Sequence, residues 1–225
     1  EMNAAKYGVT PETWVQRYHV EHQRDFSTFD IQFDHYSLTH HQTNQKLVEM
    51  IYRTLREKGY LEDRMIEGNY CVHDARFLPD RFIRGTCPRC QAPDQYGDVC
   101  EACGSTHTPT ELKEPRCALC GKTPEVRLSE HVFFKLSSPE LTEFLKRWVD
   151  SGTLNTDVAN YVKHWIETGL KDWCISRDGP YFGFPIPDKK DKFFYVWLDA
   201  PIGYIASSVE WAEKNNETLQ TLWYN

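Results

Sequence analysis

The sequence predicts an α/β protein in which a cysteine-rich insertion separates two structured parts. Three observations lead to this prediction. Apolar residues recur at helical spacing in the first part of the chain. Prolines, glycines and paired cysteines then replace large apolar residues over about 84–124. A dense aromatic and β-branched run at 192–198, followed by a helical pattern, indicates a strand–helix unit after the insertion.

Two helices are expected before the insertion. Thr10 followed by Pro11 is a helix-start signal, because a hydroxyl caps the first turn and proline is tolerated at the first helical position. A second helix is expected over about 43–58, with Gly59 as its C-cap. Short extended pieces are expected over about 60–83. The aromatic stripe of the first helix is Trp14, Tyr18, His22 and Phe26.

A strand and two further helices are expected after the insertion. Alternating apolar residues over 132–136 predict the strand. Ser138 and Pro139 provide a start for one helix, and another is expected over about 155–168, with Gly169 at its end.

The run at 192–198 predicts a buried strand. Residues 199–201 are expected to break this strand, and a helix is expected to resume over 202–214. In an α/β sheet this order places the C-terminal end of the strand, at 197–201, beside the crevice where ligands bind.

Six of the eight cysteines form three Cys-x-x-Cys pairs. Such a turn directs two thiolates at one point, and tetrahedral zinc needs two of these pairs to close a four-sulfur shell. Residues 91–99 separate the first two pairs, and nearby glycines allow the bends of a zinc knuckle. Disulfides and redox pairs are weaker alternatives, because nothing suggests secretion and no strand leads into either pair to open a helix. We therefore predict one Zn²⁺ bound by Cys87, Cys90, Cys100 and Cys103.

The third pair, Cys117 and Cys120, needs two more ligands for a second zinc. Cys71, His73 and Asp74 are the upstream candidates, and zinc accepts sulfur, imidazole nitrogen or carboxylate oxygen. A second site would require the chain to fold back so that residues 71–74 lie beside 117–120. The alternative is a vestigial knuckle held by packing.

The eighth cysteine, Cys174, lies between Trp173 and Ile175 outside any pair. We expect Cys174 to be a small buried apolar residue rather than a reactive thiol.

The composition narrows the class of protein further. At 225 residues the chain exceeds one typical domain, and its net charge of −7 comes from interspersed acidic and basic residues. No basic patch supports sequence-independent nucleic-acid binding, and no apolar run is long enough to span a membrane. Paired reduced cysteines without a signal peptide predict a cytoplasmic location. Because position 1 is Glu, we expect a piece of something longer.

Four stretches resemble the methionyl-tRNA synthetase family over essentially the whole chain. They are Phe-Leu-Pro-Asp-Arg-Phe at 77–82 leading into Gly-Thr-Cys-Pro, Asp-Gln-Tyr-Gly-Asp at 94–98, Ile-Ser-Arg-Asp at 175–178 with Pro-Tyr-Phe-Gly, and Tyr-Val-Trp-Leu-Asp-Ala-Pro-Ile-Gly-Tyr at 195–204. The resemblance implies an α/β fold that is part of a Rossmann-type class I synthetase catalytic domain, with an inserted zinc-knuckle connective-peptide domain. It also implies three segments: a helical part of the catalytic domain at 1–65, the insertion at 66–174, and a return to the catalytic domain at 175–225.

The family activates methionine with ATP and Mg²⁺ to methionyl-adenylate and then transfers the methionyl group to tRNA. Its HIGH and KMSKS motifs are absent from this sequence, so the resemblance implies that the chain by itself is inactive. In relatives with two zinc ions, position 74 would offer a cysteine, and the aspartate here puts the second metal in doubt. A stand-alone zinc-ribbon module that binds nucleic acid or protein is the alternative function, and a thiol redox protein is a third.

The resemblance assigns the methionine site to Trp197, Ala200, Pro201 and Tyr204. Trp197 would form an aromatic wall, and small Ala200 with rigid Pro201 would leave room for the thioether. The alternative is that both aromatic residues belong to an ordinary core.

Two charged residues near this string receive separate expectations. Arg177 is expected either to pair with Asp178 or Asp172, or to act electrostatically near the adenylate or as a clamp on the active-site loop. Asp199 is expected to be a buried loop cap rather than a general base.

Overall fold

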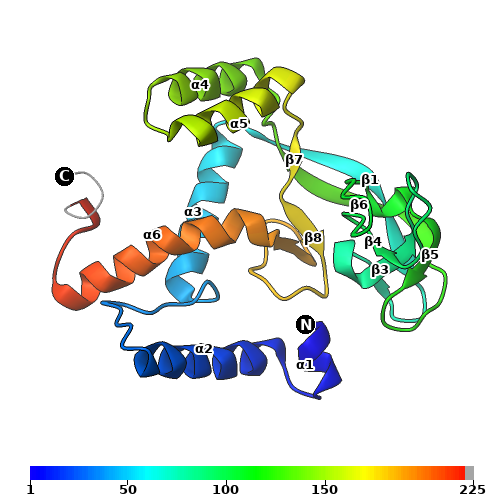
Figure 1. Cartoon of the computed structure of the whole chain (residues 1–225), viewed down its shortest axis with the longest axis horizontal. Coiled ribbons are helices and arrows are strands. Elements are labelled where there is room, and N and C mark those ends of the chain that lie inside the picture. The colour runs from blue at the N-terminus through cyan, green and yellow to red at the C-terminus, as the bar shows by residue number, and fades with distance from the viewer. Residues whose placement is uncertain (221–225) are drawn as a thin grey trace.

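The computed structural model describes residues 1–220, which fold as helices packed on small antiparallel sheets (Figure 1). The expected mixture of helix and strand is therefore confirmed. The last five residues of the predicted segment 175–225 lie outside the described part of the chain. Within residues 1–220, no helix combines the length and the apolar character needed to cross a membrane.

The N-terminal helices follow the sequence signals closely. α1 spans Met2–Lys6, α2 spans Pro11–Thr28 and α3 spans Gln42–Glu57. Thr10 caps α2, because its hydroxyl accepts a hydrogen bond from the backbone N–H of Thr13 at 3.2 Å. α2 buries no residue and lies along the lower edge of the molecule, whereas α3 runs through its centre (Figure 1).

Two long strands lie at the centre of the sheet that links the core to the insertion. β1, Leu61–Cys71, pairs antiparallel with β6, Glu125–Phe134, from Leu61 opposite Phe134 to Tyr70 opposite Glu125. β2, Arg76–Phe77, and β7, Trp173–Cys174, extend this sheet in the order β2-β1-β6-β7. The prediction of short extended pieces over 60–83 is wrong for 61–71, because pairing along the whole of β6 keeps this segment in one strand.

The β1–β6 ribbon ends in a small lobe, which we call the knuckle lobe (residues 72–124, Figure 1). Its elements are the 3₁₀ turns η1, Asp80–Phe82, and η2, Pro109–Glu111, and the strands β3, Ile83–Thr86, β4, Gln95–Tyr96, and β5, Lys113–Cys117. β3 is the central strand of its sheet, with β4 and β5 on either side. The buried cluster at its base contains only Cys71, Leu78, Phe82, Ile83, Leu112 and Cys117.

After β6, two helices form a hairpin with a separate small core. α4, Pro139–Asp150, and α5, Thr156–Thr168, match the predicted helices. Val149, Ala159 and Ile166 are the buried residues of this hairpin. The hairpin stands at the opposite side of α3 from α2 (Figure 1).

The main core lies where α3, the β1–β6 ribbon and the C-terminal elements meet. β8, Ser176–Asp178, and β9, Lys192–Phe194, form an antiparallel hairpin that leads into α6, Val196–Asn215. The buried cluster consists of Val48, Tyr52, Leu61, Val132, Ile175, Phe184, Ile186, Phe194 and Ile202.

The predicted strand at 192–198 is wrong beyond Phe194, and the predicted break at 199–201 is wrong as well. Tyr195 is the extended N-cap of α6, and Pro201 lies inside the helix. The missing N–H of Pro201 removes one helical hydrogen bond, but burial of Ile202, Ala206 and Ala212 holds the helix in place. The strand pairs of the described residues are antiparallel, so residues 197–201 lie at a helix start and not at the end of a parallel strand.

Replacement of Phe194 by alanine tests the core. The ring is fully buried and meets Tyr52 edge to face, with the ring centroids 5.2 Å apart. We expect Phe194→Ala to lower the free energy of unfolding by about 3–5 kcal/mol, because it removes apolar contact and leaves a cavity. The matched control is Phe29→Ala, at a ring that is 79% exposed, with an expected change within about 0.5 kcal/mol. Equal urea midpoints for the two variants would contradict this placement of the core.

Candidate functional site

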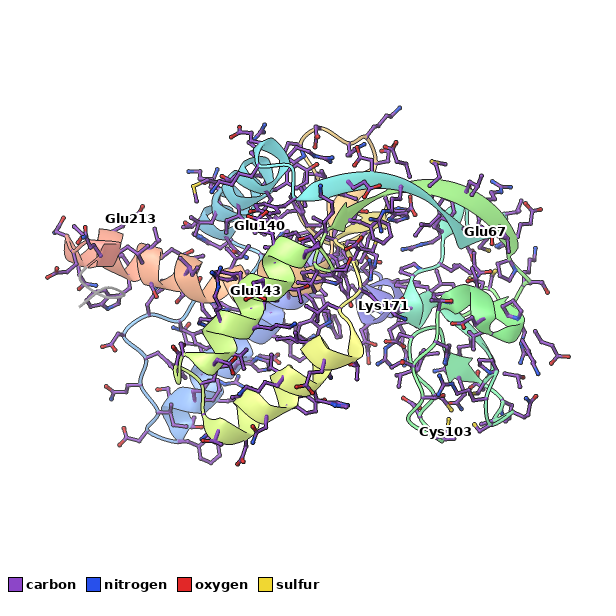
Figure 2. All side chains as sticks on the ribbon, turned by 90° about the horizontal axis from the view of Figure 1, so that it is seen from above. Glu67, Cys103, Glu140, Glu143, Lys171 and Glu213 are labelled. Carbon is purple, nitrogen blue, oxygen red and sulfur yellow. The ribbon has the colours of Figure 1, made fainter. Side chains whose placement is uncertain are left out.

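The sulfur atoms of Cys87, Cys90, Cys100 and Cys103 all lie within 4.8 Å of one another. Figure 2 shows Cys103 at the tip of the knuckle lobe, with other sulfur atoms beside it and far from Glu213 near the end of α6. Four thiolates at this spacing form the donor set of a structural zinc site, so the residues present fit the metal that the sequence predicted.

The three Cys-x-x-Cys turns share one backbone geometry. In each, the N–H of the first cysteine donates to the carbonyl five residues later, as Cys100 does to Ser105 at 2.9 Å. The residue four positions after the first cysteine donates back to the carbonyl of that cysteine and has a positive φ, at Gln91, Gly104 and Gly121. Glycine suits this position at φ 70° and 74° because it has no Cβ to clash. The shared geometry explains why all three turns can direct two sulfurs at one point.

A fourth turn of the same kind occurs at residues 71–76, with aspartate in place of the second cysteine. Cys71 pairs across the turn with Arg76, and Ala75 has a positive φ of 49°. The N–H of Asp74 points at the Cys71 sulfur at 3.4 Å, as the N–H of Cys90 points at Cys87 at 3.5 Å. The chain therefore contains four knuckle turns that come together in two pairs.

The second pair of turns places one carboxylate oxygen among three sulfurs. Asp74 Oδ2 lies 3.1 Å from the Cys71 sulfur and 3.0 Å from the Cys117 sulfur, and the Cys71 and Cys120 sulfurs are 3.5 Å apart. Ligand atoms of these four residues all lie within 4.8 Å of one another. His73 is outside this set, because its ring nitrogen contacts the other oxygen, Asp74 Oδ1, at 3.0 Å. The chain folds back as a second zinc site would require.

In each cluster, hydrogen bonds favour the ionised form of one ligand residue. Backbone N–H groups, that of Cys90 first, lower the pKa of the Cys87 thiol to about 6. Hydrogen bonds from the surrounding thiols, that of Cys120 first, hold the pKa of Asp74 well below its usual range. A bound cation would keep further thiols deprotonated, since zinc binds the thiolate form.

The four residues that the sequence assigned to a methionine site line one cavity of about 690 Å³. Trp197, Ala200, Pro201 and Tyr204 form its wall on α6, and the loop over 33–39 faces them. Trp197 and Tyr204 are 64% and 75% exposed, so the alternative that they belong to an ordinary core is wrong. The loop residues were not found from the sequence, because no motif marks them there.

Two contacts hold this loop against α6. Glu210 is buried, and its Oε2 lies 2.6 Å from His35 Nε2 and accepts a hydrogen bond from Ser37 Oγ at 2.7 Å. A Cβ on Gly203 would meet the Thr39 side chain at 3.0 Å, so glycine permits the close approach of loop and helix. These contacts fix the width of the cavity.

Asp199 is buried in the first turns of α6, which makes it part of a helix rather than the predicted loop cap. Burial raises its pKa to about 6, against hydrogen bonds from backbone N–H groups, and its Oδ1 has no partner among the described residues. Its backbone carbonyl accepts a hydrogen bond from the Nδ2 of buried Asn44 at 3.2 Å. Asn44 Nδ2 also donates to Thr39 at 2.8 Å, which joins α3, the loop and α6.

Arg177 pairs with neither of the predicted acids. Its Nη2 lies 3.5 Å from Asp80 Oδ2, and its guanidinium lies 3.7 Å from the ring centroid of Tyr195, the N-cap of α6. Asp178 and Asp172 are occupied elsewhere, by His131 and Arg64 respectively. Arg177 thus joins the knuckle lobe to the start of α6.

Cys174 is not the buried apolar residue that the sequence predicted. The residue is half-buried at the end of β7, and its sulfur lies 3.6 Å from His131 Nδ1 and 4.0 Å from Arg177 Nη1. The isolated position of Cys174 in the sequence carried no signal of these polar neighbours.

Comparison with known proteins places this fold in a class. A profile described as tRNA synthetases class I (M) matches residues 1–225, so the chain belongs to this family of class I tRNA synthetases. The match covers the knuckles together with the helices around them, which does not favour a stand-alone zinc ribbon.

One relative matches the whole chain. A protein named Methionine--tRNA ligase from Myxococcus xanthus (strain DK1622) is 52% identical over 226 residues, which is 100% of this chain. The chain spans 32% of the length of that relative.

Two solved structures show the same fold. Mycobacterium tuberculosis methionyl-tRNA synthetase in complex with methionyl-adenylate aligns with 91% of this chain and 36% of its own, at a TM-score of 0.61 and 21% identity. A second structure of that enzyme, bound by methionyl-adenylate, aligns with 98% of this chain and 39% of its own, at 0.64 and 20%. The predicted class I synthetase fold is confirmed.

The buried carboxyl of Asp199 predicts a dependence of stability on pH. Its folded-state pKa of about 6 lies above the value of about 3.9 for an unfolded chain, so the folded state binds the proton more tightly. Stability should therefore fall as pH rises from about 4 to about 6 and stay lower above that range. We expect Asp199→Asn to stabilise the protein at pH 7 by about 1–3 kcal/mol and to flatten this profile. The matched control is exposed Asp34→Asn, and an unchanged profile in Asp199→Asn would contradict the assignment.

Proposed function

We propose that this chain is part of a methionine–tRNA ligase, in which α6 supplies one wall of the methionine site. One observation carries the proposal: Trp197, Ala200, Pro201 and Tyr204 line a single cavity in a chain of the class I tRNA synthetase (M) family. The longer protein would activate methionine with ATP and Mg²⁺ and transfer the methionyl group to tRNA. The relative named Methionine--tRNA ligase and the neighbours bound to methionyl-adenylate support this activity.

The chemistry of the cavity wall suits methionine. The amino acid offers a synthetase an uncharged, flexible thioether, and sulfur–aromatic contacts contribute about 0.3–1.5 kcal/mol each. Trp197 and Tyr204 are one above the other on the exposed side of α6, and Ala200 between them leaves space. The exposed rings would be covered by the amino acid or by other parts of the longer protein.

We further infer that each knuckle cluster binds one Zn²⁺. The first would use Cys87, Cys90, Cys100 and Cys103, and the second would use Cys71, Asp74, Cys117 and Cys120. The role of both ions would be structural, because their ligand sets are complete and the lobe has few apolar residues to bury. In this arrangement His73 orients Asp74 from outside the ligand set.

The expectations for Arg177, for the three segments and for the location of the protein belong to the same proposal. The sequence predicts for Arg177 either an electrostatic role near the adenylate or a clamp on the active-site loop. Its contacts with Asp80 and Tyr195 support the clamp, which would hold the knuckle lobe against α6. The segments 1–65, 66–174 and 175–225 would correspond to catalytic domain, connective-peptide insertion and catalytic domain. A cytoplasmic location is expected for a ligase with reduced, paired cysteines.

Replacement of Trp197 in the longer protein tests the methionine site. We expect Trp197→Ala to raise the KM for methionine about 10- to 200-fold in an ATP–pyrophosphate exchange assay, which corresponds to about 1–3 kcal/mol of lost binding. The KM for ATP should change little. The reason is that the ring contacts the side chain equally in ground and transition states. The matched control is Trp165→Ala, because that indole is 55% exposed on α5 and does not line the cavity. A methionine KM unchanged by Trp197→Ala would show that the site lies elsewhere.

Metal analysis tests the two zinc sites. We expect two zinc ions per reduced, folded chain by inductively coupled plasma mass spectrometry. Asp74→Ala should leave one, because three sulfurs without a fourth ligand bind zinc more weakly, and Asp74→Cys should keep two. Asp98→Ala is the control in the same lobe, since Asp98 pairs with Arg81 and lies outside both clusters. One zinc in the unaltered chain would eliminate the second site, and none would eliminate both.

A further inference from the structure

A chain of polar contacts runs from Asp178 through His131 towards Cys174. Asp178 Oδ2 lies 3.0 Å from His131 Nε2, and Asp178 Oδ1 accepts hydrogen bonds from Ser129 Oγ at 2.7 Å and from Lys192. The carboxylate therefore fixes the imidazole ring and leaves Nδ1 facing Cys174. His131 is buried, with 8% of its surface exposed.

His131 Nδ1 has a hydroxyl, a backbone carbonyl and a thiol as neighbours, and the carbonyl oxygen of Ser176 lies 3.3 Å from it. Ser176 Oγ lies 2.8 Å from Nδ1, and Cys174 Sγ lies 3.6 Å from it. Ser176 is fully buried and already accepts a hydrogen bond from the N–H of Val132 at 2.9 Å. Cys174 is half-buried and lines a cavity, so the thiol is the one of the two groups that a small molecule can reach.

The charges around the sulfur favour the thiolate. Burial disfavours the ionised thiol, but His131 and Arg177 outweigh that effect and the pKa of Cys174 is lowered. Burial also disfavours the imidazolium, yet Asp178 and Cys174 raise the pKa of His131 to about 9. Glu67 and Asp80 also line the cavity, and Lys192 contacts Asp178. Arg64 on β1 lies directly opposite His131 in the β1–β6 pairing.

The cavity beside Cys174 has a mostly apolar wall that carries a few polar groups. Its volume is about 440 Å³, and it lies between the β1–β6 ribbon and the knuckle lobe. Asn69 is 97% buried and lines the same cavity, and its Nδ2 has no hydrogen-bond partner among the described residues. A buried amide donor without a partner is costly, and a ligand oxygen would satisfy it. Arg177 supplies a second donor in the same wall.

We propose that Cys174 is a nucleophilic cysteine and a modification site, at which small hydroperoxides oxidise the sulfur to a sulfenic acid. The proton of the thiol passes to His131 Nδ1, and the thiolate attacks the terminal oxygen of the hydroperoxide. The S–O bond forms as the O–O bond breaks, so that sulfur loses two electrons and the hydroperoxide is reduced. The alkoxide or hydroxide that leaves takes the proton from the imidazolium of His131. Asn69 and Arg177 donate hydrogen bonds to the peroxide oxygens. The proposal does not depend on the ligase activity or on zinc.

The first experiment measures the alkylation of each cysteine by limiting iodoacetamide, with peptide mapping by mass spectrometry. We expect the reaction of Cys174 to follow a pH–rate profile whose midpoint lies clearly below about 8.5, the ordinary value for a thiol. Because each cysteine is mapped separately, the result for Cys174 stands whatever the metal content. A midpoint at or above 8.5, or a Cys174 that reacts no faster than the same residue in the urea-unfolded chain, would overturn the proposal.

The second experiment replaces His131, the proposed base, and then treats the protein with hydrogen peroxide. We expect His131→Gln to slow alkylation of Cys174 at pH 7 at least about tenfold, because a thiol without this partner is only a few per cent ionised there. The matched control is His164→Gln, at an exposed histidine on α5, with an unchanged rate. Hydrogen peroxide followed by dimedone should label Cys174 in the unaltered chain and not in Cys174→Ser. Equal rates in the two histidine variants, or a dimedone adduct absent from Cys174, would overturn the proposal. If His131→Gln does not fold, the pH–rate profile and the dimedone adduct of the unaltered chain decide the question.

Discussion

The antiparallel pairing of β1 with β6 is the constraint on which the other parts of the structure depend. The chain leaves the core along β1 and returns along β6, with pairing from Leu61–Phe134 to Tyr70–Glu125. Everything between the two strands therefore becomes a closed lobe that starts and ends at one place, which brings Cys71 and Asp74 beside Cys117 and Cys120. The same ribbon returns the chain to α3, so that β7, β8 and α6 complete the core there. Loss of register by one residue would turn every side chain of the ribbon to the opposite face.

The knuckle lobe has no large apolar core and is built from four turns of similar geometry. The three Cys-x-x-Cys turns use the same hydrogen-bond pattern, and all four turns have a left-handed residue four positions after the first ligand. Each turn directs two ligand atoms at a shared point. Because the lobe buries few apolar side chains, its rigidity is expected to come from metal coordination and from the β3-centred sheet. Arg177 then couples the lobe to α6 through Asp80 and Tyr195.

The two cavities differ in chemistry although α6 and β8 lie close together in the chain. The cavity between α6 and the loop at 33–39 presents exposed aromatic rings and small residues, which suits an apolar side chain. The cavity beside Cys174 adds Asn69, Arg177 and a His131–Asp178 pair to a mostly apolar wall, which suits a small molecule with oxygens that accept hydrogen bonds. Glu210 and Asp178 play parallel parts, because each carboxylate fixes a histidine at the edge of its cavity.

The sequence by itself determined the features that depend on short spacing. The helices at 11–28, 42–57, 139–150 and 156–168 and the three cysteine pairs could be predicted, because caps, apolar stripes at helical spacing and Cys-x-x-Cys turns act within a few residues. The residues of the α6 wall were assigned by the resemblance of 195–204 to a family and not by local spacing. Only the tertiary structure decided where α6 begins, since an aromatic run can be either strand or helix until packing against α3 selects one. Pairing over the length of β6 likewise decided that Leu61–Cys71 is one strand. The partners of Arg177 and the surroundings of Cys174 lie up to 97 residues away, from Asp80 to Arg177, and no local pattern encodes contacts at that separation.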